Sequence, residues 1–310
     1  MITLTKRSNY WRPYSGRQPI IQEAAESDTS RLQLLLRGSV DYADELTPLE
    51  DRTAAQSATV QAVQFTSSVG VYIVFKTSRP PWNNVALRQA VARAIPYDSI
   101  IKNIYYGTQA ERWYTLLPPW FLGATNKYWT YKTDPAAARA AFKSLGGKAV
   151  TLTYRAGRGA DQEIAILLET ALRQAVLNVQ LSGLPTERFD AIKHSHVRDF
   201  FTAEKTPIIP SSEYHLQQFF LPTGGLNMQQ YKSPAYNAIL AQLIAATSAG
   251  ARASRQIHLI EQAQKVLCHD LPQIPLAFTA NVAAFSKSLR IRPYVNNTGG
   301  NFSPAQLEDA

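Results

Sequence analysis

The segment Gly70–Ile101 constrains the fold of this chain most, because a strand pattern passes there directly into a helix pattern. It opens with Val71–Phe75, a β-branched and aromatic run that is typical of a buried strand. Pro80 and Pro81 then end the strand and hold the backbone extended. After them, apolar residues recur at helical spacing and predict an amphipathic helix over Val85–Ala94. Strand, proline corner and helix together indicate an α/β fold.

A second α/β unit is predicted in the middle of the chain. Val150–Tyr154 reads as a strand, Asp161–Ala175 as a long amphipathic helix, and Val176–Gly183 as the next strand. This order favours parallel pairing of the two strands through a right-handed crossover. Further helices are predicted over 30–37, 48–58, 97–106, 133–146, 187–193, 235–246 and 251–270, and further strands over 2–5, 20–23, 60–66 and 281–289.

Composition bounds the class of protein. A chain of 310 residues can bury a large core and suggests about two domains. It has no apolar run long enough to span a membrane, and its first residues lack the apolar core of a signal peptide. Its single cysteine, Cys268, excludes an internal disulfide and is expected to be buried. The formal net charge is +9, but the basic residues form no stripe with interleaved aromatics, so nucleic acid is not an expected partner.

The motif inventory argues against an enzyme. The sequence contains no GxSxG, HExxH, Walker or CxxC motif, and no spacing of its serines and histidines recommends a triad. His194 and His196 invite a metal interpretation, but without a third ligand nearby a solvated pair is favoured. We therefore predict no enzymatic activity, no metal site and no cofactor.

The strongest clue is a resemblance carried by two blocks. The matching residues of the first block are Tyr72, Phe75, Thr77, Pro80, Pro81, Val85, Leu87, Arg88, Gln89, Ala90, Ala94, Ile95 and Ile101, and those of the second are Arg255, Ala263, Gln264, Leu267, Asp270, Pro272, Ile274, Pro275 and Leu276. With these, the chain resembles the family 5 solute-binding proteins of bacterial ABC importers, the dipeptide-, oligopeptide- and nickel-binding group. The resemblance covers nearly the whole chain.

The resemblance implies an α/β fold of the periplasmic-binding-protein type, with two lobes and a hinge. Residues 1–72 and 276–310 are expected to form a partial first lobe, and residues 73–275 a complete second lobe. The family's leader and the first part of its first lobe have no counterpart here. A lobe without its first strands would expose apolar surface and unpaired edges. The chain alone is therefore expected to close poorly on a ligand, which an affinity of micromolar or tighter would contradict.

The resemblance also implies a ligand site, with one departure. Its expected positions are Tyr72, Lys205, Thr206, Ile208, Glu213 and Tyr214. The segment 199–220 resembles a loop of the family. In this loop, peptide-binding relatives have a tryptophan and an aspartate, and the aspartate pairs with the ligand's amino group. This chain has Lys205 and Ile208 at these two positions instead. The amine anchor is thus absent, unless Glu204 or Glu213 replaces it. Lys205 would suit a carboxylate or another anion, or would simply be exposed at a lobe edge.

The implied function is that of a substrate-binding component of an ABC importer. It would capture a peptide or peptide-like solute between two lobes and deliver it to permease subunits, as a monomer. The full-length protein would be periplasmic or lipid-anchored outside the cytoplasmic membrane, although no signal peptide is found in this chain. Opines, sugars and metal chelates stay open as ligands. The alternative is a truncated or repurposed binding domain with a sensory or regulatory role, with a hydrolase a distant third.

Overall fold

The computed structural model describes residues 1–310 except 6, 10–18, 24, 26, 45, 66–68, 195–198, 207–208, 292–306 and 310. The chain divides into two compact units, each described here by itself. Unit 1 comprises residues 1–67, 157–159 and 280–310, and unit 2 comprises residues 68–156 and 160–279. No helix in the described ranges combines the length and the apolar character that crossing a membrane requires.

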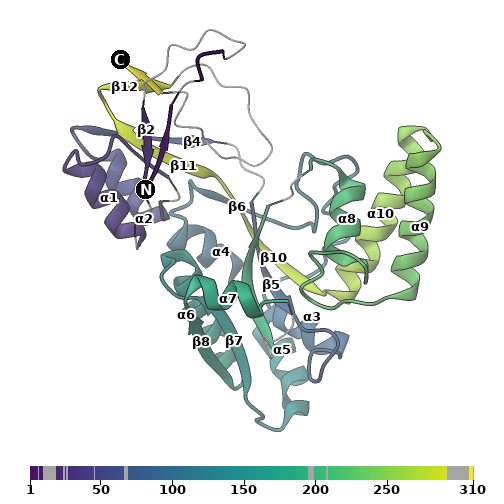
Figure 1. The fold of residues 1–310 in the computed structure, drawn as a ribbon. Helices are drawn as coiled ribbons and strands as arrows, with labels where there is room; N and C mark the ends of the chain where they lie inside the picture. Colours follow the sequence, from purple (N-terminus) through teal and green to yellow (C-terminus); the bar gives the residue numbers. More distant parts are fainter. Residues whose placement is uncertain are drawn as a thin grey trace. The chain divides into compact units, whose positions relative to one another are not determined.

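Unit 2 is built on a six-stranded mixed sheet with the strand order β6-β10-β5-β9-β7-β8 (Figure 1). Its strands are β5 (Gly70–Phe75), β6 (Ala110–Arg112), β7 (Val150–Arg155), β8 (Val179–Leu184), β9 (Phe200–Lys205) and β10 (Gln273–Thr279). β7 runs parallel to β8 and to β9, whereas β5 is antiparallel to both β9 and β10. The predicted parallel strand–helix–strand unit is therefore confirmed, with helix α6 as the crossover.

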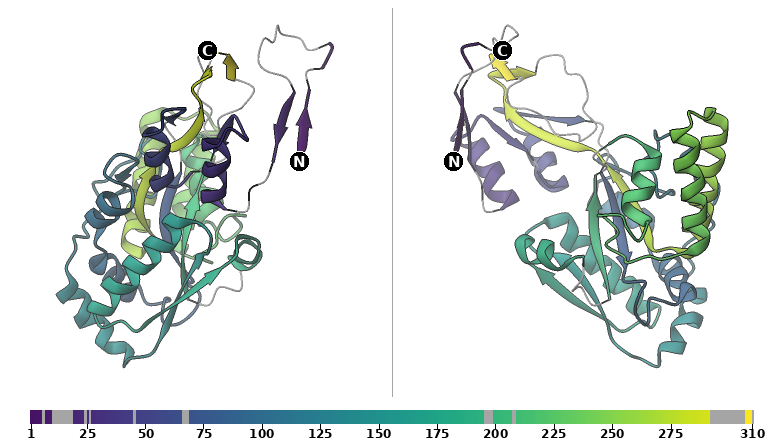
Figure 2. Two further views of the ribbon diagram at one scale, coloured as in Figure 1. Left: turned by 90° about the vertical axis from the view of Figure 1, so that its left-hand side faces the viewer. Right: turned by 45° about the vertical axis from the view of Figure 1, so that its right-hand side comes forward.

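Helices cover both faces of this sheet. One face packs against α3 (Val85–Ala94), the short α4 (Tyr97–Ser99) with the π-helix Ile100–Ile104, α5 (Pro135–Phe142) and α6 (Gly159–Gln174). The other face packs against α7 (Thr186–Ile192), α8 (Ser212–Phe220), α9 (Pro234–Ser248) and α10 (Ala253–Asp270). In Figures 1 and 2, α9 and α10 lie side by side with α8 next to them. The sheet is thus the middle layer of three.

The proline corner and its helix form as the sequence predicts. All six residues of β5 are buried, and the side chain of Asn84 caps α3 by accepting a hydrogen bond from the backbone N–H of Ala86 at 2.9 Å. Arg88, which is 3 % exposed, points away from solvent. Its Nε donates to the carbonyls of Asp270, at 2.8 Å, and Leu271, at 3.0 Å. The guanidinium therefore ties α3 to the C-terminal end of α10.

Unit 1 contains a three-stranded antiparallel sheet in the order β3-β11-β4 and two helices. Its elements are β1 (Ile2–Leu4), β2 (Ile20–Gln22), α1 (Asp28–Leu36), β3 (Tyr42–Asp44), α2 (Pro48–Ala55), β4 (Val60–Phe65), β11 (Asn281–Ser286), β12 (Leu289–Ile291) and β13 (Leu307–Asp309). β1 and β2 form a separate antiparallel pair. Ile2 and Ile21 on this pair are 59 % and 55 % exposed.

Three local predictions are wrong for identifiable reasons. Helix α1 begins at Asp28 rather than at residue 30, because Ser27 caps it: the Ser27 hydroxyl accepts a hydrogen bond from the backbone N–H of Ser30 at 3.2 Å. The helix expected over 97–106 is a single α-turn that passes into a π-helix. The strand after α6 begins three residues later than predicted, because Val176 adopts a left-handed φ of +63° in the turn.

Candidate functional site

Several strand ends meet at one edge of the unit 2 sheet. β9 ends at Lys205, which lies opposite Gly70 at the start of β5. Gly70 in turn lies opposite Phe278 near the end of β10, and the parallel strand β7 ends at Arg155. The chain also passes between its two units next to these ends, after residues 67, 156 and 279. In open α/β sheets, ligands bind beyond the carboxyl ends of parallel strands, which makes this edge the candidate site.

Lys205 occupies an aromatic enclosure on the α8 side of the sheet. The residue is only 4 % exposed, and its Nζ lies 5.6, 4.9 and 6.0 Å from the ring centroids of Tyr72, Phe219 and Phe220. Its ammonium donates a hydrogen bond to Oε1 of Gln273, the single hydrogen-bond partner that it has among the described residues. The interpretation of Lys205 as an exposed residue is therefore wrong, because the side chain is enclosed by rings.

The electrostatic surroundings of Lys205 disfavour its charge. Burial first, and the positive charge of Lys76 second, lower the pKa of Lys205 to about 7. Burial and then Lys205 lower the pKa of His215 to about 3, against an opposing effect of the Leu116 backbone. At neutral pH the imidazole is consequently neutral and the amine is close to half protonated. A buried basic group with no acid to compensate it is typical of functional sites.

Two further polar groups near Lys205 lack partners. The amide nitrogen Nε2 of Gln273, a fully buried residue, makes no hydrogen bond within the described part of the chain. The same holds for the indole Nε1 of Trp113, which is 2 % exposed and whose ring lies 5.6 Å from that of Tyr72. Both atoms are donors, so the surroundings of Lys205 offer N–H groups that lack acceptors among the described residues.

The second buried lysine, Lys76, is placed in the opposite way. It follows β5 directly and is fully buried. Its Nζ donates to the backbone carbonyls of Lys193, His194 and Met228 at 2.7, 2.8 and 2.6 Å. An ammonium has three N–H donors, so Lys76 is completely satisfied. Although burial and Arg79 lower its pKa to about 8, Lys76 stays protonated at neutral pH and joins three chain segments.

A second basic group, Arg155, lies at the same edge of the sheet. Arg155 donates through Nε to Asp161 at 3.2 Å and through Nη2 to Glu204 at 3.4 Å. Its guanidinium also lies 5.8 Å from the ring centroid of Phe189. Glu204 precedes Lys205 on β9 and so projects from the other face of the strand. Glu204 is thus already committed to Arg155.

The structure brings together two of the sequence-predicted site residues. Tyr72 and Lys205 are neighbours. Thr206 is half-buried directly after β9. Glu213 and Tyr214 lie in the first turn of α8, where Glu213 accepts a hydrogen bond from Gln217 at 2.6 Å. Ile208 lies outside the described residues.

The histidine pair lies only partly within the described residues. His194 is exposed and contributes its carbonyl to Lys76, while His196 lies outside the described residues. Within the described ranges, no group of three or more His, Cys, Asp or Glu side chains is arranged to hold a metal ion.

Sequence reasoning missed most of the enclosure around Lys205. Gln273, Trp113, Phe219 and Phe220 were not recognised as neighbours of this lysine. The segment 199–220 was aligned to a loop of the family, but it contains strand β9 and helix α8. Two signals were available in the sequence. One is the polar Gln273 beside an apolar strand pattern, and the other is the adjacent Phe219 and Phe220 near the end of a segment with helical spacing.

Gly70 leaves room for the rings beside Lys205. A Cβ at this position would come within 2.6 Å of side-chain atoms of both Trp113 and Tyr72. We therefore expect Gly70→Ala to lower the free energy of unfolding by about 1–3 kcal/mol, measured by urea denaturation, because overpacking displaces buried rings. Gly225→Ala is the matched control, since its Cβ would meet only Gln218 at 3.6 Å. Equal stability of the two variants would contradict the tight packing of Tyr72.

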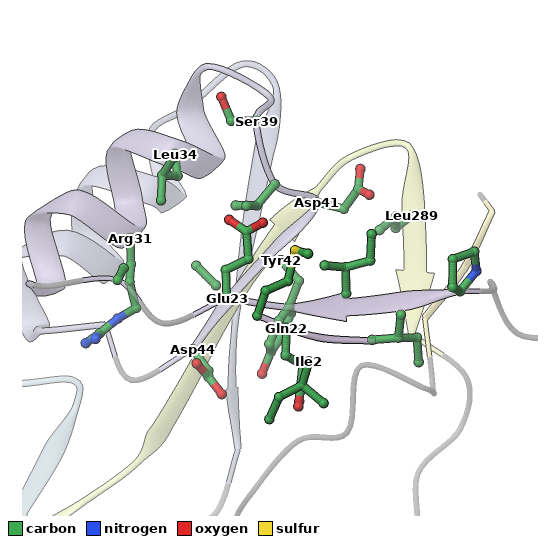
Figure 3. A pocket seen from close by; sticks show the side chains of 17 residues that line it. Ile2, Gln22, Glu23, Arg31, Leu34, Ser39, Asp41, Tyr42, Asp44 and Leu289 are labelled. Atoms are coloured by element: carbon green, nitrogen blue, oxygen red, sulfur yellow. The ribbon is translucent and has the colours of Figure 1, made fainter. Parts of the chain in front are cut away.

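Unit 1 contains a cavity of about 780 Å3 between the β1–β2 pair, α1 and β3 (Figure 3). Carboxylates of Glu23, Asp41 and Asp44 and the guanidinium of Arg31 line it together with apolar side chains. Arg31, Asp41 and Asp44 all have interaction partners. Three of the four charged side chains in this cavity therefore already have partners, and the candidate site stays on unit 2.

The chain matches known proteins over most of its length. Residues 1–227 match the model of the bacterial extracellular solute-binding proteins, family 5. A probable ABC transporter periplasmic-binding protein, SapA of Escherichia coli K12, is 25 % identical over 320 residues and 95 % of this chain. The glutathione-binding protein GsiB of the same organism is 23 % identical over 322 residues and 99 % of this chain.

A solved structure supports the same fold. The dipeptide-binding protein from Pseudoalteromonas sp. SM9913, in complex with Met-Leu, superposes with a TM-score of 0.85 at 19 % identity over 98 % of this chain. The chain spans 55 % of the length of SapA, 61 % of GsiB and 61 % of the Pseudoalteromonas protein.

Proposed function

Since the chain belongs to the bacterial extracellular solute-binding proteins of family 5, which have the two-lobed α/β fold of periplasmic binding proteins, we propose that it captures a peptide or peptide-like solute for a permease of the ABC type. The match of the family model to residues 1–227 carries this proposal. The relatives are named as binding proteins, and the candidate site offers hydrogen-bond donors and aromatic surfaces to a solute.

We further propose that unit 2 corresponds to the second lobe and unit 1 to part of the first. The predicted boundaries, residues 73–275 for the second lobe, lie within five residues of the outer limits of unit 2, residues 68 and 279. A relative of this chain is named a periplasmic-binding protein, and this supports a location outside the cytoplasmic membrane for the protein.

The proposed solute contacts are Tyr72, Lys205, Thr206, Ile208, Glu213 and Tyr214, of which Lys205 is the most informative. Its position in the sequence is the one at which the resemblance places a tryptophan, and the aspartate position holds Ile208. A solute bound here would not need a free amino group for a counter-charge. It would benefit from a carboxylate that reaches the ammonium of Lys205.

Two matched probes test the proposal. Isothermal titration of the full chain with Met-Leu and with N-acetyl-Met-Leu should show saturable binding of both, weaker than micromolar because the first lobe is expected to be partial, and at similar affinity because the chain lacks the amine anchor. Lys205→Ala should weaken both by about tenfold or more, as a charge-assisted hydrogen bond is lost. Lys102→Ala, which removes an exposed lysine, should change neither.

The outcomes separate the claims. No saturable binding of either peptide, or of glutathione, would contradict a peptide-like solute. Binding of Met-Leu without binding of its N-acetyl form would instead show that an acidic side chain still anchors the amine, with Glu213 the residue to substitute next.

A further inference from the structure

The residues around Lys205 form a buried cluster in which several polar groups lack hydrogen-bond partners among the described residues, the neutral imidazole of His215 included. We name it the Lys205 cluster; its members are Lys205, Gln273, Trp113, Tyr72, His215, Phe219 and Phe220. Lys205 uses one of its three N–H groups, on Gln273. Nε2 of Gln273 and Nε1 of Trp113 use none in the described part of the chain. Buried donors without acceptors are rare in folded proteins and call for a bound water or ion.

The charges that face this cluster are all basic or neutral. β5 contributes the phenol of Tyr72, and Lys76 follows this strand directly. Burial raises the pKa of the Tyr72 phenol far above its ordinary value. From α8 comes His215, whose imidazole is neutral at working pH. The pKa of Lys205 is set by burial and by Lys76, with no acid contributing. The cluster therefore contains a buried cationic group without any counter-charge, and such a group is costly.

We propose that the Lys205 cluster is an anion site that takes one carboxylate, accepting hydrogen bonds from Nζ of Lys205 and Nε2 of Gln273. A single carboxylate supplies both the counter-charge and the acceptors that these groups lack. The carboxylate comes either from a small free anion or from the captured solute. In the second case the inference rests on the proposed function, and in the first it is independent of it.

Protonation of Lys205 is linked to this binding. The anion pairs with the ammonium and not with the neutral amine, so bound anion raises the pKa of Lys205. Where Lys205 is only partly protonated, binding of the anion is therefore accompanied by uptake of a proton. Its apparent affinity should fall by about tenfold for each pH unit above the unliganded pKa, which is about 7. His215 does not interfere, because its pKa of about 3 keeps it neutral across this range.

The first experiment uses formate as the free carboxylate. The melting temperature of the full chain is followed while sodium isethionate, a bulkier monovalent anion, is exchanged for sodium formate at constant ionic strength. We expect a saturable rise at pH 6.5 that is lost at pH 9. Lys205→Met should abolish the rise, whereas Lys102→Met should keep it. Gln273→Glu places a carboxylate within the cluster and should raise the melting temperature without formate while removing the response to formate.

The second experiment identifies the source of the carboxylate. N-acetyl-Met-Leu and its C-terminal amide are titrated into the chain and into Lys205→Met. A Lys205-dependent preference for the acid, without any response to formate, assigns the carboxylate to the solute. A Lys205-dependent response to formate, with the acid and the amide binding alike, assigns it to a free anion.

Two results would overturn the proposal. One is a formate response that persists in Lys205→Met and in Gln273→Glu, which would place the effect elsewhere on the protein. The other is the absence of both the formate response and the preference for the acid. If Met-Leu still binds in that case, the anion site fails while the proposed solute-binding function stands. Circular dichroism of each variant confirms that it is folded before either conclusion is drawn.

Discussion

Replacing Lys76 by Met is expected to lower the free energy of unfolding by about 3–5 kcal/mol. Methionine fills a similar volume but donates no hydrogen bond, so the carbonyls of Lys193, His194 and Met228 lose their shared donor. A buried acceptor that loses its partner bears its desolvation cost without compensation. Three such acceptors on two distant chain segments make this one of the most damaging single substitutions in unit 2.

Urea denaturation at pH 7 measures this effect, with the midpoint and the slope fitted separately. Hydrogen exchange should also show faster opening after α7 and around Met228, because those segments lose their common anchor. Lys205→Met is the matched comparison, since it is the same substitution at a second buried lysine and is expected to raise the free energy of unfolding instead of lowering it. Stability within about 1 kcal/mol of the wild-type value would show that the carbonyls around Lys76 find other donors, such as water.

The layered fold was predictable because its signals are local. The β-branched and aromatic run of β5, the prolines after it and the spacing of α3 act over a few residues each, and all three appear as expected. The parallel pair β7–β8 followed from strand–helix–strand order alone. By contrast, β9 and α8 lie in a segment that looked like a loop, because Pro207, Pro210 and two serines interrupt its pattern.

The candidate site was predictable only at single positions. Lys205 stood out because it replaces an aromatic residue, and Tyr72 because it belongs to the signature segment. Their shared enclosure depends on Gln273, which is 68 residues from Lys205 in the sequence. No periodicity encodes a contact at that separation. The three backbone carbonyls that accept hydrogen bonds from Lys76 could not be predicted either, because every residue type has a backbone carbonyl.

The two buried lysines show that burial alone does not decide what a lysine contributes. Lys76 has one acceptor for every N–H and holds chain segments together. Lys205 has a single neutral acceptor and aromatic faces. Cation–aromatic contacts offset only part of the desolvation of an ammonium. A lysine therefore stabilises the fold at position 76 and lowers the free energy of unfolding of the unliganded chain at position 205. Such a cost is expected for a residue that is retained for binding.

Lys205→Met is accordingly expected to stabilise the chain in acid and neutral solution and to change the pH dependence of its stability. The pKa of Lys205 is about 7 in the folded chain and 10.5 as the ordinary value in the unfolded chain. Between these values the unfolded state binds the proton and the folded state does not, so wild-type stability rises with pH. At 1.36 kcal/mol per pKa unit, the rise from pH 7, where the folded chain is half protonated at Lys205, to pH 9 amounts to about 2 kcal/mol, and this contribution is absent in the variant.

The measurement is the difference in the free energy of unfolding between wild type and Lys205→Met from pH 6 to pH 9, which cancels the groups common to both, including Lys76. At pH 6 the variant should be more stable by about 2–3 kcal/mol, because removal of the buried charge outweighs the loss of the hydrogen bond to Gln273. At pH 9 the difference should have nearly disappeared. If the difference in the free energy of unfolding does not change with pH, Lys205 keeps its ordinary pKa, because its amine contacts water or a carboxylate. Saturating formate is a further check, since at pH 6 it should raise the stability of the wild type toward that of Lys205→Met if the amine is buried without a counter-charge.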